Sequence, residues 1–215
     1  MTGKAEKTNP NENVAQLHLM ADIDVEKLGY EDLKQGAVGH TWISVQWNDP
    51  TQVPDDIHAS HKNYLKKPGK HADTMGFWPD IAGYHGEPIG YSTNPFKSYV
   101  QGHMRQPDDA HKNKEKATRT YDLKRSEVDN VIKYAEGKRG SKYSVYFYNC
   151  STFAQQAVKA AGKSAPSMSK GGICFPNAVY DGIKADQKAG RGNTTVKDMA
   201  SGDETTVNGP DSKKR

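Results

Sequence analysis

The segment YFYNCSTFAQQAV constrains the fold most, because it places a strand directly before a helix. Alternating aromatic and aliphatic residues at 143–148 predict the strand. The residues that follow, 150–161, space their apolar side chains along one face of a helix, and Gly162 supplies the stop signal. A strand that passes into a helix through so short a turn predicts a helix packed on a sheet.

A stronger strand is predicted at 38–47, which is rich in β-branched and aromatic residues. Successive side chains of a strand point to opposite faces of its sheet, so the two faces can be read separately. One face carries Ile43, Val45 and Trp47, and the other carries His40, Trp42 and Ser44. Further strands are predicted at 14–22, 74–78 and 119–123, and further helices at 126–137 and 176–183. The expected fold class is therefore α+β.

Length and composition predict a single domain with polar ends. The 215 residues include only 34% hydrophobic residues but many aromatic ones, which is typical of a compact core with long polar loops. We expect 1–13 to be a disordered N-terminus and 14–185 to form the domain. The tail, 186–215, has almost no apolar residues and is expected to be disordered. A long loop is expected at 48–73, where prolines and charged residues gather.

Charge and hydropathy disfavour several classes of function. A net charge of +4 arises from 30 basic and 26 acidic residues mixed along the chain, so no face is expected to follow nucleic acid. There is no run of eighteen apolar residues, and the first residues lack the apolar core of a signal peptide, so neither a membrane span nor a signal peptide is expected. Two cysteines are too few for a disulfide scaffold and fit synthesis in a reducing cytoplasm.

Cys150 is the leading candidate for a nucleophile. It stands in the first turn of the predicted helix, with Asn149 in the capping position. Unpaired N–H groups and the positive end of the helix dipole stabilise a thiolate there, and the same groups can bind an oxyanion. The alternative is a buried cysteine with a packing role, because cysteine is a good core residue. Cys174 is interpreted as a small buried side chain near the site.

His40 is the leading candidate for the base. It lies on a strand whose other face is apolar, and such a strand would hold the imidazole rigidly toward a helix packed on the sheet. A satisfied core or surface histidine is the alternative for any one of the eight histidines. Together, His40 and Cys150 predict a cysteine hydrolase that needs no cofactor.

Two motifs carry a resemblance to a known family. GHTWIS, followed more than a hundred residues later by YNCSTFAQQAVKAAG, resembles the circularly permuted branch of the papain-like NlpC/P60 peptidase superfamily, across about 38–183. GFWP between these motifs also resembles secretion-system effectors and toxins of that fold. The resemblance implies an antiparallel sheet packed against the cysteine helix, with Cys150 and His40 catalytic. It also implies cleavage of amide bonds in peptidoglycan stem peptides.

The same resemblance implies a setting for the protein. An antibacterial effector without a signal peptide would be made in the cytoplasm, bound by a carrier of a secretion machine and released into the periplasm of a target cell. An immunity protein would be a further partner. Two alternatives stay open, which are an acyltransferase or thioesterase of the same permuted fold acting on lipid or host protein, and a non-catalytic binding module.

The residue that orients His40 is not settled by sequence. The resemblance implies that it lies on the next strand, where Thr74 is the candidate, with His71 and Asp73 just before it. Trp42 and Trp78 are candidates for substrate binding, although core packing is an alternative for both. A metal site formed by His58, His61 and His71 is another interpretation of the loop at 48–73. No metal is expected, because no cysteine or HExxH-like helix supports such a site.

Overall fold

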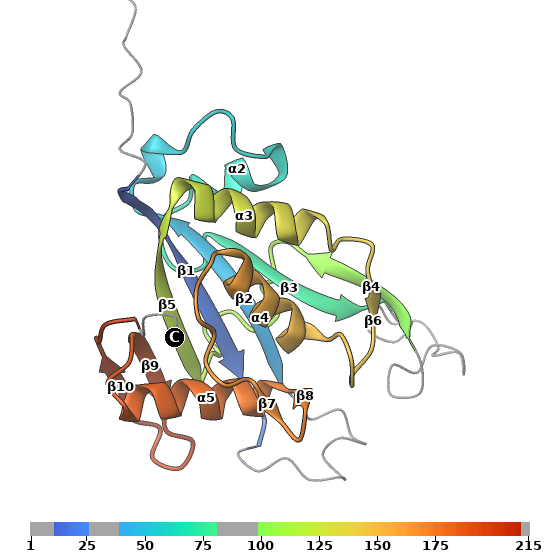
Figure 1. The fold of residues 1–215 in the computed structure, drawn as a ribbon, viewed down its shortest axis with the longest axis vertical. Coiled ribbons are helices and arrows are strands. Elements are labelled where there is room, and N and C mark those ends of the chain that lie inside the picture. The colour runs from blue at the N-terminus through green and yellow to red at the C-terminus, as the bar shows by residue number, and fades with distance from the viewer. Residues whose placement is uncertain (1–10, 26–38, 81–98, 212–215) are drawn as a thin grey trace, which may run out of the picture.

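The computed structural model describes residues 11–25, 39–80 and 99–211. They form an α+β fold around one antiparallel sheet with the strand order β10-β9-β5-β1-β2-β3-β4-β6, and the α+β class is therefore confirmed (Figure 1). The strands of the sheet are β1 (Asn13–Asp22), β2 (His40–Trp47), β3 (Asp73–Pro79), β4 (Val100–Arg105), β5 (Ala117–Lys124), β6 (Lys142–Tyr143), β9 (Asn193–Lys197) and β10 (Glu204–Val207).

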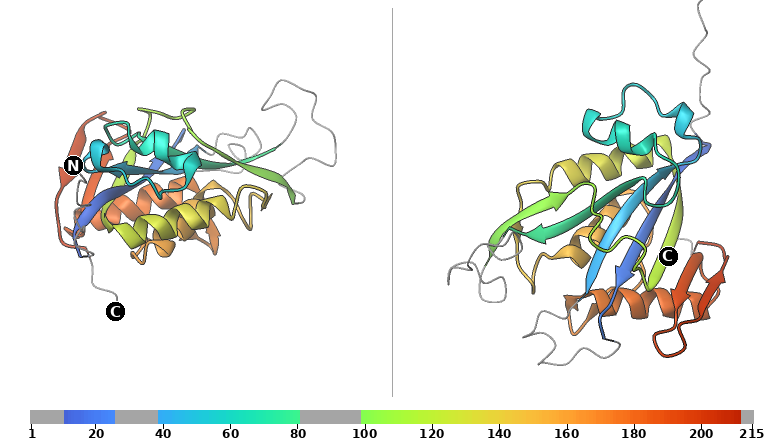
Figure 2. Two further views of the ribbon diagram at one scale, coloured as in Figure 1. Left: turned by 90° about the horizontal axis from the view of Figure 1, so that it is seen from above. Right: turned by 180° about the vertical axis from the view of Figure 1, so that it is seen from behind.

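Helices cover both faces of the sheet. The helices are η1 (Pro50–Gln52), α2 (Ala59–Leu65), α3 (Arg125–Glu136), α4 (Cys150–Ala160) and α5 (Pro176–Lys188), and a short hairpin is formed by β7 (Ser169–Lys170) and β8 (Ile173–Cys174). Figure 2 shows α3, α4 and α5 on one face and α2 on the other. None of the helices in the described ranges is long and apolar enough to cross a membrane.

The core lies between the sheet and the layer of α3, α4 and α5. Ile43, Val45 and Trp47 of β2 belong to it, as the alternation predicted. Helix α3 buries the four residues that the sequence spaced along one face, which are Val128, Val131, Ile132 and Ala135. Helix α4 rests on β2 through Phe153, Ala154, Ala157 and Val158. Each fully buried Val, Leu, Ile, Met or Phe side chain in this layer contributes about 1.5–3 kcal/mol. This packing fixes where α4 begins relative to β2.

The strand expected at 143–148 is mostly a turn, and that prediction was wrong. Only Lys142 and Tyr143 pair with β4, and a bridge between Ser144 and Tyr148 closes the chain on itself. Phe147 is 69% exposed in this turn. The apolar residues of the segment therefore do not form the buried face of a continuous strand. The turn leads directly into α4.

The expectation of a disordered tail over 186–215 was also wrong for 186–211. Helix α5 continues to Lys188, and β9 and β10 extend the sheet beside β5. Polar contacts hold this segment where apolar residues are scarce. The buried Arg119 of β5 pairs with Asp186 at 3.0 Å and with Asp211 at 2.9 Å, and it donates to the Arg191 carbonyl. The domain expected at 14–185 is therefore too short.

Two smaller expectations also need correction. The disordered N-terminus proposed for 1–13 ends too late, because Asn13 begins β1; residues 1–10 lie outside the described residues. The long loop expected at 48–73 contains η1 and α2. Buried Leu65 and His61 anchor α2, which explains a helix in so polar a segment.

Candidate functional site

Cys150 is the first residue of α4, as the sequence predicted. Asn149 caps the helix, and its Oδ1 accepts a hydrogen bond from the Thr152 backbone N–H at 3.0 Å. The Asn149 amide also donates to the carbonyls of Val145 and Cys174, at 2.7 Å each. One side chain therefore fixes the turn, the β7–β8 hairpin and the start of the helix around the thiol.

The imidazole of His40 and the thiol of Cys150 lie close enough for each to shift the pKa of the other. His40 is the first residue of β2, and Gly39 before it has a φ of 67°. A Cβ at Gly39 would overlap the Asp22 carbonyl oxygen, so glycine lets the chain enter β2 against the end of β1. The predicted nucleophile and base are thus brought together by α4 and β2.

Asp108 is the third member of the cluster. Its Oδ2 lies 2.8 Å from His40 Nε2, which leaves Nδ1 as the ring nitrogen available to the thiol. The Trp78 indole N–H donates to the same carboxylate oxygen at 2.9 Å. Asp108 is 1% exposed and lies in the loop between β4 and β5. Its carboxylate can hold the orientation and tautomer of His40.

The charges of the cluster favour a thiolate and an imidazolium. Burial alone would lower the pKa of His40, but hydrogen bonds and charge from Asp108 and Cys150 outweigh it and raise the pKa to about 9. Burial would raise the pKa of Cys150, yet the His40 hydrogen bond and charge, together with the Thr41 backbone N–H, lower it below its ordinary value. For Asp108, burial is likewise outweighed by His40, Trp78 and Arg105, and its pKa is lowered.

Thr74, the candidate for orienting His40, holds Asp108 instead. The Asp108 backbone N–H donates to Thr74 Oγ1 at 2.9 Å and to the Thr74 carbonyl at 3.2 Å. His71 and Asp73 are engaged elsewhere, since His71 pairs with Glu115 and Asp73 with His61. The geometry therefore replaces Thr74 with Asp108 as the orienting residue. No sequence pattern singles out Asp108, because it lies in an irregular loop that is distant in sequence from both His40 and Cys150.

Gly76 of β3 is a second residue that the sequence analysis missed. A Cβ at this position would overlap Asp108 Oδ2 and would lie 2.7 Å from His40 Nε2. The close approach of the His40 imidazole to the Asp108 carboxylate thus requires glycine at position 76.

Trp42 and Trp78 both lie against His40, but they are buried. Trp42 stacks on the imidazole with ring centroids 5.8 Å apart, and Trp78 lies over it at 4.2 Å. Their exposed fractions are 1% and 8%. In this structure they form walls around the imidazole, and the expectation that they bind substrate stays a prediction.

A second His–Asp pair adjoins the cluster. His111 Nδ1 lies 2.7 Å from Asp22 Oδ2, and the His111 ring is 5.0 Å from that of His40. Asp22 and His40 are partners in the β1–β2 ladder, while Asp108 and His111 share one loop. Each histidine therefore bonds to an aspartate of the opposite segment, and the two pairs clamp the loop onto the sheet.

Both cysteines are free thiols. Cys174 is partly buried in β8, and its carbonyl accepts the hydrogen bond from Asn149. It therefore lies beside the start of α4, as the sequence analysis expected, and leaves Cys150 available as a nucleophile.

Comparison of the chain with protein-family models, with curated proteins and with solved structures finds no match.

Proposed function

We propose that this chain is a cysteine hydrolase that cleaves amide bonds. The observation that carries the proposal is the proximity of the Cys150 thiol to the His40 imidazole at the start of α4, close enough to lower the thiol pKa, with Asp108 behind the imidazole at 2.8 Å. Nucleophile, base and orienting carboxylate come from three separate segments of the chain. Their convergence in one buried cluster is more than a core cysteine would require.

The arrangement supplies each step of an acyl transfer. The Cys150 thiolate attacks the substrate carbonyl, and the oxyanion that forms accepts hydrogen bonds from N–H groups at the start of α4 that have no partner within the helix. His40, held by Asp108, gives its proton to the leaving amine as the C–N bond breaks. Water then attacks the thioester with His40 as base, which releases the carboxylic acid and restores the thiol.

We propose the stem peptides of peptidoglycan as the substrate. The support is the resemblance of GHTWIS and YNCSTFAQQAVKAAG to the permuted NlpC/P60 branch. The corresponding biological role is that of an antibacterial effector toxin that reaches the periplasm of a target cell. A carrier of the secretion machine and an immunity protein are its proposed partners.

Digestion of purified sacculi, with analysis of the released muropeptides, tests this function. The wild-type chain should release peptide fragments, and Cys150→Ala and His40→Ala should each reduce release by at least roughly 10²-fold. The double variant should be scarcely slower than either single one, because both residues serve the same step. Near-wild-type cleavage by both single variants would refute the dyad.

Alkylation separates a failed substrate assignment from a failed nucleophile. Iodoacetamide at neutral pH should modify Cys150 faster than Cys174, because burial raises the pKa of Cys174 while His40 lowers that of Cys150. If Cys150 reacts quickly but sacculi stay intact, the hydrolase proposal needs another substrate. If Cys150 is inert until the chain is denatured, the binding-module alternative takes its place.

A further inference from the structure

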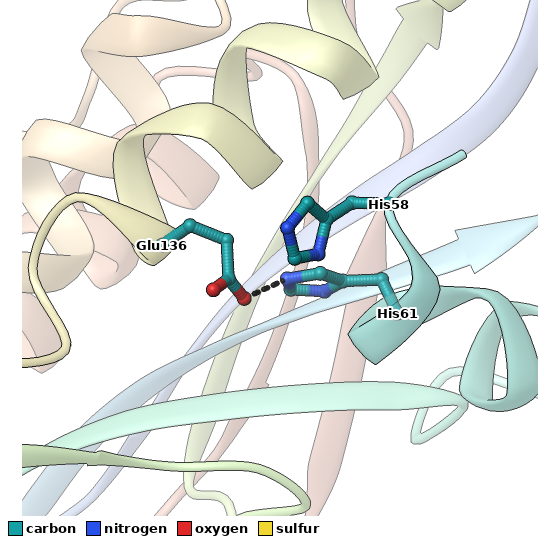
Figure 3. Close-up of side chains that lie close together, drawn as sticks. All are labelled: His58, His61 and Glu136. Atoms are coloured by element: carbon teal, nitrogen blue, oxygen red, sulfur yellow. Dashed lines mark hydrogen bonds and ion pairs between the residues drawn. The ribbon is translucent and has the colours of Figure 1, made fainter. Parts of the chain in front are cut away.

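Three metal-ligating groups meet outside the proposed active site, between α2 and α3. His58 precedes α2, His61 lies within it, and Glu136 is the last residue of α3 (Figure 3). One imidazole nitrogen of each histidine and one carboxylate oxygen of Glu136 all lie within 4.8 Å of one another. His71 pairs with Glu115 instead, so the histidine trio weighed from the sequence does not form.

A buried carboxylate already orients His61. The side chain of His61 is fully buried, and its Nδ1 lies 2.6 Å from Oδ2 of Asp73, which is buried as well. The other ring nitrogen, Nε2, lies 2.8 Å from Glu136 Oε1. A carboxylate behind one imidazole nitrogen is the usual support of a metal-binding histidine, because it fixes the tautomer and directs the free nitrogen at the ion.

The cluster is open to solvent on one side. His58 is exposed, and Glu136 keeps a fifth of its side chain accessible. A surface hollow is lined by Asp56, His58, Asp129, Ile132, Lys133 and Glu136. A hydrated cation can therefore reach the three ligands, and a water molecule can complete its shell.

We propose that His58, His61 and Glu136 bind a divalent transition-metal ion, with Zn²⁺ as the best match. Two imidazoles and one carboxylate, plus water, form a familiar tetrahedral zinc set. Ligand atoms on one tetrahedral zinc lie roughly 3.3 Å apart, given Zn–N bonds of about 2.0–2.1 Å. Because His61 and Glu136 are already close, His58 supplies most of the adjustment, and its side chain is exposed. The ion replaces the proton between His61 Nε2 and Glu136 Oε1, which leaves to solvent.

Arg139 competes with a metal ion for the carboxylate of Glu136. Its guanidinium donates to Glu136 through Nε to Oε2 and through Nη2 to Oε1, at 2.6 Å each. Ser60 Oγ also donates to Oε1, at 2.9 Å. An ion on Oε1 displaces the Nη2 contact and leaves Arg139 on Oε2. Removing the guanidinium should therefore strengthen binding, whereas a purely structural ion-pair network would gain no affinity for metal.

Calorimetric titration of the full chain with ZnCl₂ tests the proposal. The titrated protein carries Cys150→Ala, so that a zinc thiolate at the other site does not contribute. One ion per chain should bind, and saturation at 100 times Kd should raise Tm by roughly 5–10 °C. His58→Ala should weaken binding at least roughly tenfold, while the metal-free Tm stays the same because His58 is exposed. Arg139→Gln should lower the Kd for Zn²⁺ several-fold.

His71→Ala is the matched control, because it removes a histidine of the same segment that lies outside the cluster. It should bind zinc as tightly as the parent. Substitution with Co²⁺ supplies an independent readout, since a tetrahedral site gives a visible spectrum that His58→Ala should abolish. No binding below roughly 100 μM Zn²⁺, or binding that His58→Ala leaves unchanged, would overturn the proposal. Neither result depends on hydrolase activity.

Discussion

Asp108 is the residue on which the proposed chemistry most depends after the dyad itself. Its carboxylate is hydrogen-bonded to the His40 imidazole and to the Trp78 indole N–H, and its backbone N–H donates to Thr74 Oγ1. Gly76 leaves the space that this convergence needs. Because all these contacts are buried, the carboxylate has one position available to it, and His40 is held in one orientation.

Asp108→Asn should slow hydrolysis by roughly 10²-fold or more. The amide keeps the size of the carboxylate but removes its charge and lets the wrong tautomer of His40 form. Steady-state kinetics with a soluble muropeptide would measure the loss as a fall in kcat. Thr74→Val is the matched control, because it removes only the support of Asp108 and should cost less. An equal loss in both variants would argue for general loosening of the loop.

The pH dependence of kcat/KM should be bell-shaped. Activity should rise with pH as Cys150 ionises below the ordinary thiol pKa, since His40 lowers that pKa. It should fall again as His40 loses its proton near pH 9, the pKa to which Asp108 and Cys150 raise it. Asp108→Asn removes one cause of that rise, so its alkaline limb should move to lower pH. An alkaline limb that stays in place in this variant would contradict the assignment.

Among the elements, helix α4 depends most on its cap. The side chain of Asn149 makes hydrogen bonds to Thr152, Val145 and Cys174, which belong to the helix, the preceding turn and β8. The hydroxyls of Thr41 and Ser151, 2.9 Å apart, fix the same helix end against β2. The position of the thiol is therefore set by side chains of the preceding turn, of β2 and of α4 itself.

Asn149→Ala should destabilise the chain by about 1–3 kcal/mol, which combines a lost cap with lost side-chain hydrogen bonds. The thiol should also react more slowly with iodoacetamide, because the helix start that stabilises the thiolate frays. Thermal unfolding and alkylation rates measure the two effects. Asp49→Ala removes the cap of η1, far from the thiol, and should leave the alkylation rate unchanged. Alkylation slowed equally in both variants would count against the cap.

At the scale of the whole molecule, the last part of the chain completes the sheet. Strand β9 pairs with the edge of β5, β10 pairs with β9, and α5 packs on β9. Arg119 is 1% exposed, and its partners Asp186, Arg191 and Asp211 all come from this part. A segment poor in apolar residues is thus integral to the fold through backbone pairing and one buried cation.

Truncation after Ala185 should therefore destabilise the protein, which the removal of a disordered tail would not do. The truncation removes β9, β10 and the three partners of Arg119, and each lost hydrogen bond of this charged group costs about 1.5–3 kcal/mol. Urea unfolding would measure the change. A second truncation, after Asp211, removes only the last four residues and should leave the midpoint unchanged. A chain ending at Ala185 that kept full stability would show that the edge of the sheet is not needed.

Sequence periodicity by itself determined the elements whose pattern is local. Strand β2, helix α3 and helix α4 follow from alternation or from a helical spacing of apolar residues, and the position of Cys150 at a helix start follows with them. The stretch at 143–148 shows the limit of this reasoning. The same alternation can belong to a strand or to a turn, and the Ser144–Tyr148 bridge selects the turn.

Only the tertiary structure decided which distant side chains meet. Asp108 reaches His40 across 68 residues of sequence, Glu136 reaches His61 across 75, and Asp211 reaches Arg119 across 92. Such pairs leave no periodic trace, because each contact depends on the path of a loop and on the burial that makes a polar partner necessary. The sequence therefore located the proposed nucleophile and base, while the tertiary structure placed Asp108 behind His40 and brought together the groups between α2 and α3.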